Sequence, residues 1–198
     1  MVDWATLQSA CEGCHRCPLG DTRTNLVFGV GNPQADILFV GEGPGEQEDL
    51  RGEPFVGKAG ILLDKMLACI GLSRKENVYI ANIVKCRPPH NRDPLPEERS
   101  ACLPFLRAQT LLIRPKIIVC LGKVAATTLI DPSFSIMRSH GLWYERKGFW
   151  MTATFHPAAL LRNESLKKEA YADLLRIQAK YSSLSSFQKK EPSEESDD

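Results

Sequence analysis

The sequence predicts an α/β protein: a three-layer αβα sandwich around a central, mostly parallel four-stranded sheet. Four short apolar runs, each long enough for one strand, are separated by segments with helical periodicity. That alternation is typical of sheets whose crossover connections place helices on both faces. With 198 residues and 43% hydrophobic content, the chain can bury the core of one such domain.

The four predicted strands are short runs of mostly aliphatic and β-branched residues. They are ADILFV at 35–40, VYIANIV at 78–84, KIIVCL at 116–121 and WMTATF at 150–155. Runs with so little polar alternation are typical of strands covered on both faces, as parallel strands are.

Helical segments follow each of these strands. Apolar residues three and four apart predict a helix around 61–70, which Gly71 would end. A second helix is expected at 97–113, because Pro96 favours the first turn of a helix and Pro115 follows. Two further helices are expected at 122–130 and 164–181.

We therefore expect one domain over residues 1–181 and a disordered acidic tail over 182–198, which is rich in Ser, Glu and Asp. The tail has two lysines and five acids, a charge of −3. Because the whole chain has a net charge of +1, the body carries +4. That charge permits a phosphate-binding face without requiring one.

The chain has no run of about 18 apolar residues, so we expect no membrane partner. It begins Met1-Val2-Asp3-Trp4, without an apolar signal region. These observations predict a cytoplasmic protein. Its seven cysteines would lie in a reducing compartment, where metal binding is favoured over disulfides.

Five cysteines have the spacing of metal ligands. Cys11, Cys14 and Cys17 form a C-x2-C-x2-C pattern, and Cys86 and Cys102 lie near the second strand and the second helix. Two nearby and two remote thiolates can close a four-sulfur site, which suits zinc and an iron–sulfur cluster equally. The spacing does not choose between the pairs Cys11/Cys14 and Cys14/Cys17.

The other two cysteines have apolar neighbours. Cys69 belongs to a helical pattern and Cys120 to a strand, so both are expected to be small core residues.

A glycine-rich segment, Gly41-Glu42-Gly43-Pro44-Gly45, follows the first strand. It departs from the dinucleotide-binding fingerprint, which would require glycine at Glu46. The later segment 52–59 departs from a phosphate-binding loop, because Ala59 replaces the magnesium-binding Ser or Thr. The glycine-rich segment 41–45 is therefore interpreted as a tight loop that presents Glu42.

Three polar segments, 41–45, 85–92 and 156–162, each follow a predicted strand. Ligands of open α/β sheets bind beyond the carboxyl ends of the strands. The sequence therefore predicts that these segments meet in one cleft.

Four runs resemble the family 4 uracil-DNA glycosylases. They are CHRCPLGDTRTN (14–25), GEGPGEQEDLRGEPFVGKAG (41–60), NIVKCRPPHNRDP (82–94) and FHPAALLR (155–162). The resemblance extends from about residue 14 to 181 in the same order. It implies a DNA repair enzyme that flips uracil out of DNA and hydrolyses its N-glycosidic bond, leaving an abasic site.

The resemblance also implies a cofactor. In that family one [4Fe-4S] cluster is held by four cysteines, and the matching positions are Cys14, Cys17, Cys86 and Cys102. Cys11 is then an additional cysteine. The cluster would have a structural role.

The family's uracil pocket can be transferred residue by residue. Phe55 would stack on the flipped base, Asn82 would read its polar edge, and Glu48 would exclude the thymine methyl group. His156 would bond the base oxygen that gains charge, and Glu42 would position or activate water. Gly41 and Gly43 of the same loop would lie against the substrate.

The resemblance places DNA contacts after the fourth strand. Leu160 or Leu161 would fill the space that the base leaves, and Arg162 would lie near the DNA backbone. The expected partner is uracil-containing DNA, single- or double-stranded, bound by a monomer.

Three alternatives remain at this point. One is a catalytically silent iron–sulfur relative that recruits a polymerase or another repair protein, and one is a zinc-stabilised protein with another function. The third is a variant that links covalently to the abasic sugar through a histidine, for which His90 lies in the corresponding region.

Overall fold

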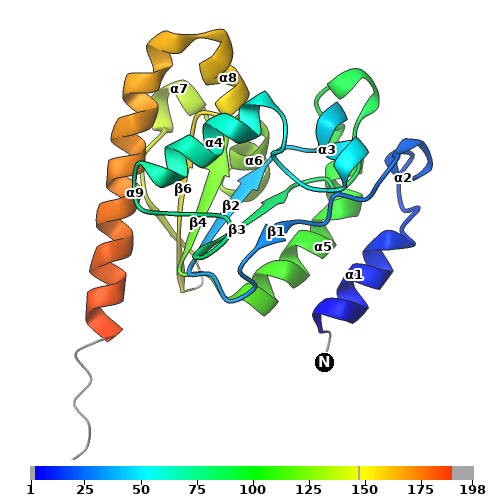
Figure 1. Cartoon of the computed structure of the whole chain (residues 1–198), viewed down its shortest axis with the longest axis horizontal. Helices are drawn as coiled ribbons and strands as arrows, with labels where there is room; N and C mark the ends of the chain where they lie inside the picture. Colours follow the sequence, from blue (N-terminus) through cyan, green and yellow to red (C-terminus); the bar gives the residue numbers. More distant parts are fainter. Residues whose placement is uncertain (1–2, 147, 189–198) are drawn as a thin grey trace, which may run out of the picture.

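The structure is a computed structural model that describes residues 3–146 and 148–188. Its centre is a six-stranded sheet with strand order β1-β3-β2-β4-β6-β5. The four inner strands are parallel to one another: β3 (Val78–Asn82), β2 (Ile37–Gly41), β4 (Ile117–Leu121) and β6 (Phe149–Thr154). These are the four predicted strands, so the predicted α/β fold is confirmed (Figure 1).

Two strands were not predicted. β1 (Val30–Gly31) and β5 (Tyr144–Arg146) lie at the two edges of the sheet and run antiparallel to their neighbours. The sheet therefore has six strands rather than four. Both edge strands are short and partly exposed, so they lack the apolar run that identifies a buried strand.

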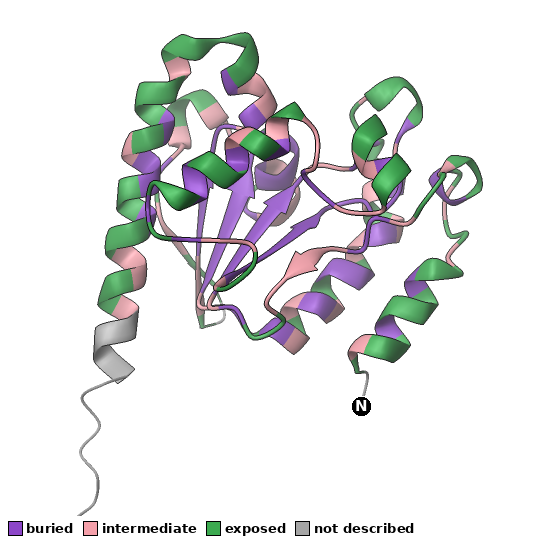
Figure 2. Ribbon diagram, in the orientation of Figure 1, coloured by how far each residue is buried: buried purple, intermediate pink, exposed green. Residues whose placement is uncertain are grey.

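Two hydrophobic cores cover the two faces of the sheet. One face packs against α1 (Trp4–Glu12), α5 (Pro96–Ile113) and α6 (Lys123–Leu129). The other packs against α4 (Lys58–Ala68), α8 (Pro157–Arg162) and α9 (Lys167–Gln188). Successive residues of β2 and β4 alternate between the two cores, as the period of a strand requires. Strands β2, β3 and β4 are accordingly buried throughout and β6 over its last four residues, whereas the helices expose their outer sides (Figure 2).

The remaining helices are short and lie in the connections. They are α2 (Leu19–Thr22), α3 (Glu46–Arg51), η1 (Pro89–Asn91), α7 (Ile136–Ser139) and η2 (Glu164–Leu166). None was predicted, because segments of three to six residues do not establish a helical period.

The last helix differs from its predicted bounds. It begins at Lys167, after the short turn η2, and continues to Gln188 rather than ending at Tyr181. Tyr181 and Leu184 pack against the core of the α4 face, and this contact favours the additional turns. The expected tail therefore begins as helix at 182–188, and its remainder, 189–198, lies outside the described residues.

The two cysteines assigned to the core have different surroundings. Cys120 is fully buried within β4, as predicted. Cys69 is exposed, so its assignment to the core was wrong. It is the C-cap residue of α4, and at this end of the helix the next residue, Ile70, is the buried one. None of the described helices is long and apolar enough to cross a membrane.

Candidate active site and cysteine pocket

A cleft of about 510 Å³ opens at the carboxyl ends of β2, β3 and β6. We call it the strand-end cleft. Parallel pairing brings the ends of these strands to one edge of the sheet, as the sequence predicted. The sequence-predicted residues that line it are Glu42, Gly43, Glu48, Phe55, Asn82, His156 and Arg162.

Asn82 is the last residue of β3 and is 2% exposed. Its side-chain oxygen Oδ1 is buried and has no hydrogen-bond partner within the described part of the chain. Burying an acceptor in this way costs about 1–3 kcal/mol. Such an atom is therefore expected to accept a hydrogen bond from a ligand that enters the cleft.

Gly41 faces Asn82 in the parallel register of β2 and β3. A Cβ atom at Gly41 would collide with Asn82 Oδ1 and would lie 2.6 Å from Cζ of Phe55. Glycine is therefore required here for close approach. Gly41 leaves room for the side chains of Asn82 and Phe55, and it does not itself line the cleft.

Phe55 is held in an uncommon backbone conformation. Its φ is 55°, in the left-handed region that a bulky residue rarely adopts. Arg74 stabilises it by donating to the carbonyl oxygens of Pro54 and Phe55, at 2.8 and 2.7 Å. The Phe55 ring is 5% exposed, and its centroid lies 5.5 Å from that of the His156 ring.

Glu48 lies on α3 with its carboxylate fixed by the backbone. Its Oε1 accepts from the amides of Val56 and Gly57, both at 2.9 Å. These bonds join α3 to the segment that carries Phe55, so the carboxylate and the ring form one wall of the cleft.

His156 caps the N-terminus of α8. Its Nδ1 accepts from the amide of Ala158 at 3.1 Å, so the neutral ring carries its proton on Nε2. Burial, together with the nearby Arg162 cation, lowers the pKa of His156 to about 4. The ring is therefore an uncharged donor at neutral pH.

Glu42 follows β2 and is paired with an acid that sequence reasoning missed. Burial, together with the adjacent Asp93 carboxylate, raises the pKa of Glu42 to about 7, and Arg99 and Arg162 oppose this effect. Asp93 also lines the cleft. The only sequence signal for it was an acidic residue in the loop after β3.

Gly43 lies next to Glu42 and must be small. A Cβ atom there would lie 2.7 Å from Cγ2 of Val84. His90 is exposed and does not line the cleft, although its neighbours Asn91 and Arg92 do.

The structure separates the two leucines that were predicted as alternatives. Leu160 is 1% exposed and belongs to the core of the α4 face, so it was wrongly included among the DNA-facing residues. Leu161 is 45% exposed, and Arg162 beside it is exposed at the end of α8. Adjacent residues on a helix point about 100° apart, which explains the difference.

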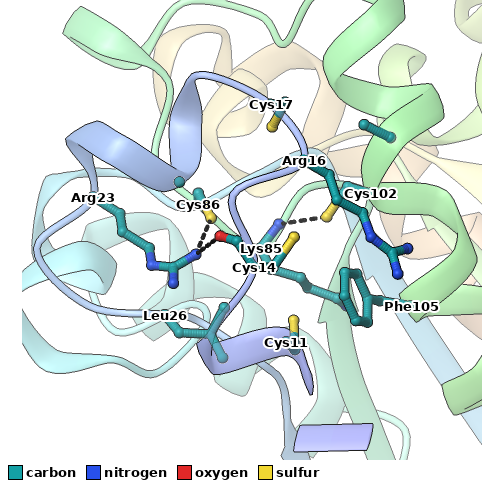
Figure 3. A pocket seen from close by; sticks show the side chains of 12 residues that line it. Cys11, Cys14, Arg16, Cys17, Arg23, Leu26, Lys85, Cys86, Cys102 and Phe105 are labelled. Atoms are coloured by element: carbon teal, nitrogen blue, oxygen red, sulfur yellow. Dashed lines mark hydrogen bonds between the residues drawn. The ribbon is translucent and has the colours of Figure 1, made fainter. Parts of the chain in front are cut away.

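A second pocket, the cysteine pocket, is lined by Cys11, Cys14, Cys17, Cys86 and Cys102 (Figure 3). α1, the loop before α2, the end of β3 and α5 bring these residues together. Within the described ranges, no three His, Cys, Asp or Glu side chains are arranged to hold a single metal ion.

Three cations, Arg16, Arg23 and Lys85, line this pocket together with the cysteines. Arg23 Nη1 donates to Cys86 Sγ at 3.1 Å and to the carbonyl of Cys14 at 3.2 Å. Lys85 is completely buried at the same pocket, and burial lowers its pKa to about 8, while the nearby sulfurs of Cys102 and Cys11 oppose that effect. A set of sulfurs flanked by cations suits an anionic thiolate-bound group.

Comparisons with known proteins identify the family to which this chain is similar. A sequence model of the uracil DNA glycosylase superfamily matches residues 28–176. A type-4 uracil-DNA glycosylase of Archaeoglobus fulgidus is 51% identical over 172 residues, covering 83% of this chain and 86% of that protein. One from Thermotoga maritima is 51% identical over 156 residues, covering 77% and 80%. One from Sulfurisphaera tokodaii is 45% identical over 173 residues, covering 83% and 78%.

Proposed function

This chain belongs to the uracil-DNA glycosylase superfamily, and we propose that it excises uracil from DNA by hydrolysing the N-glycosidic bond. The observation that carries the proposal is the buried, unpartnered Oδ1 of Asn82 beside the ring of Phe55. One amide side chain can accept from N3–H of uracil and donate to its neighbouring oxygen. Cytosine has no proton on that nitrogen and would leave Oδ1 without a partner.

The walls of the cleft favour uracil further. Phe55 offers a flat apolar surface on which a flipped base can stack. Glu48 is fixed by two backbone amides, so it would not move aside for the additional methyl group of thymine.

The charges of the cleft suit cleavage of an N-glycosidic bond. As the bond breaks, positive charge develops on the sugar and negative charge on the departing uracil. The Nε2–H of His156 would stabilise the uracil oxygen, and the Glu42 carboxylate would stabilise the sugar and orient the attacking water.

Leu161 and Arg162 are the proposed DNA contacts. Leu161 is exposed and precedes Arg162, which lines the cleft, so it can enter the gap that the flipped base leaves and offset part of the cost of unstacking. Arg162 would contact a phosphate. Because one chain supplies the whole cleft, we propose a monomer that acts in the cytoplasm on single- or double-stranded DNA.

We propose that Cys14, Cys17, Cys86 and Cys102 hold a [4Fe-4S] cluster, with Cys11 as an additional cysteine. The donor set fits, because all four cysteines line one pocket together with three cations, which would balance the negative charge of a thiolate-bound cluster. When bound, the cluster supplies a rigid cross-link between the N-terminal segment and the loop after β3. The hydrolysis itself requires no electron transfer.

A catalytically silent binding protein is not favoured by this arrangement. Glu42, Asn82 and His156 all line the same cleft, and each has the environment that the reaction requires. A covalent variant is not favoured either, because His90 is exposed and is not among the residues that line the cleft.

Cleavage of a uracil-containing oligonucleotide, read after alkali treatment, tests the function. His156→Ala should lower kcat by about 10²–10³-fold, because the transition state loses a positioned donor. His90→Ala, a substitution of an exposed histidine outside the cleft, should leave kcat unchanged. Intact strands with the unsubstituted protein, or a DNA adduct that His90→Ala abolishes, would contradict the proposal.

The pH profile tests Glu42. Between about pH 5 and 9, kcat/KM should rise as the pH passes through about 7, because the reaction needs the ionised carboxylate and burial raises its pKa. His156 is already neutral over this range and adds no further step. Asp93→Asn should move the midpoint to lower pH, and Glu42→Gln should remove the rise. A rise that persists in Glu42→Gln would assign it to another group.

Metal analysis tests the cofactor. Cys102→Ser should abolish the iron, the sulfide and the visible absorbance, because it removes one of the four proposed ligands. Cys11→Ser and the exposed control Cys69→Ser should keep all three. Zinc without sulfide, or an equal loss in Cys11→Ser, would disprove the proposed ligand set.

A further inference from the structure

Lys85 is the most deeply buried cation of the described residues, with none of its surface exposed. A buried ammonium group is costly unless it is paired with anions or hydrogen-bond acceptors. The proposed reaction does not use this residue. Lys85 lies in the sequence between Asn82, the last residue of β3, and the proposed ligand Cys86.

The polar groups of Lys85 join three parts of the molecule. Its Nζ donates to the carbonyl oxygen of Asn82 at 3.0 Å. Its backbone amide donates to Sγ of Cys102 on α5 at 3.3 Å, and its carbonyl accepts from the amide of Val27 at 2.9 Å. One residue therefore contacts the end of β3, the cysteine pocket and the N-terminal segment.

The anion that balances this ammonium group must come from the cysteines. Lys85 lines the cysteine pocket, and the lining of that pocket contains no carboxylate (Figure 3). The Asn82 carbonyl is the single hydrogen-bond acceptor of Nζ among the described residues. Thiolates that hold an iron–sulfur cluster would supply the missing negative charge.

We propose that Lys85 is a positioning residue that couples the cysteine pocket to the uracil-reading side chain of Asn82. The inference rests on the proposed function. The anionic cluster holds the ammonium group in place, and the ammonium group holds the Asn82 carbonyl. Fixing the Asn82 carbonyl also fixes the direction of the Asn82 side chain. Its Oδ1 has no hydrogen-bond partner among the described residues.

Arg23 provides a matched comparison. It is also a cation beside the cysteines, bonded to Cys86 Sγ and to the Cys14 carbonyl. It makes no hydrogen bond to Asn82 and does not line the strand-end cleft. Loss of either cation should therefore weaken the cluster, whereas only loss of Lys85 should disturb uracil recognition.

The experiment uses the iron-loaded full chain carrying His156→Ala, which slows cleavage so that DNA binding can be measured. The probes are two single-stranded oligonucleotides that differ by one uracil or thymine. Their Kd ratio measures recognition, and the bleaching of visible absorbance by an iron chelator measures cluster retention. Variants Lys85→Met and Arg23→Met are compared in this background, with and without Asn82→Ala.

Lys85→Met should lower the preference for uracil by about tenfold, the effect of losing one hydrogen bond to a charged donor. Arg23→Met should keep the preference, and both variants should bleach faster than the parent. With Asn82→Ala present, Lys85→Met should cause no further loss of preference, because the two residues act as one unit.

An unchanged preference in Lys85→Met, or an equal loss in Arg23→Met, would overturn the proposal. Lys85→Gln, which keeps a donor without the charge, serves if Lys85→Met does not fold. If both Lys85 variants fail to fold while Arg23→Met folds, the residue is structural and the proposal is wrong. A parent protein with no preference for uracil would instead contradict the proposed function, and the bleaching rates would still report on Lys85.

Discussion

The parallel pairing of β2 with β3 is the constraint on which the site depends. Its register places Gly41 opposite Asn82, at the edge of the sheet where both strands end. Because Gly41 has no side chain, the Asn82 amide and the Phe55 ring can both lie against it. A shift of the register by one residue would turn Asn82 to the other face of the sheet. The geometry of the base pocket is thus fixed by backbone hydrogen bonds within the core.

The environments of His156 and Glu42 move their pKa values in opposite directions. His156 lies against Phe55 with Arg162 nearby, and both burial and the cation keep its ring uncharged. Glu42 is partly buried beside Asp93, and burial together with the neighbouring carboxylate keeps the pKa of Glu42 high. Titratable groups whose pKa values are moved in opposite directions are a recurrent feature of acid–base sites. In the proposed function, His156 is the neutral donor to the base and Glu42 is the ionisable acid near the sugar.

Much of the fold could be predicted from the sequence, because four apolar runs are a strong signal for buried parallel strands. The edge strands β1 and β5 escaped prediction because they are short and half exposed. Cys69 was misassigned because the helical pattern around it does not show where α4 ends, and at that end the side chain turns to solvent.

The site could be predicted only as far as its motifs extend. The position of Glu42, Asn82 and His156 after three strands indicated a shared cleft, and the structure brings them together. The sequence could not distinguish Leu160 from Leu161, because it does not show which side of α8 faces the core. Asp93, Arg74 and Lys85 were missed, because each contacts residues of a segment that the sequence does not place beside it.

One short segment, residues 82–86, contributes to both the cleft and the cysteine pocket. Asn82 faces the cleft, Cys86 faces the cysteine pocket, and Lys85 between them contacts both the Asn82 carbonyl and Cys102. On our proposal, this arrangement lets the cluster influence recognition of the base although it takes no part in hydrolysis.

The central claim is that the unpartnered Asn82 oxygen reads uracil. The most direct measurement is a crystal structure of the His156→Ala protein bound to a single-stranded oligonucleotide containing one uracil. The account predicts N3 of uracil within hydrogen-bond distance of Asn82 Oδ1, with the base against the Phe55 ring. A base bound elsewhere, or an Asn82 oxygen that bonds a protein group instead, would contradict it.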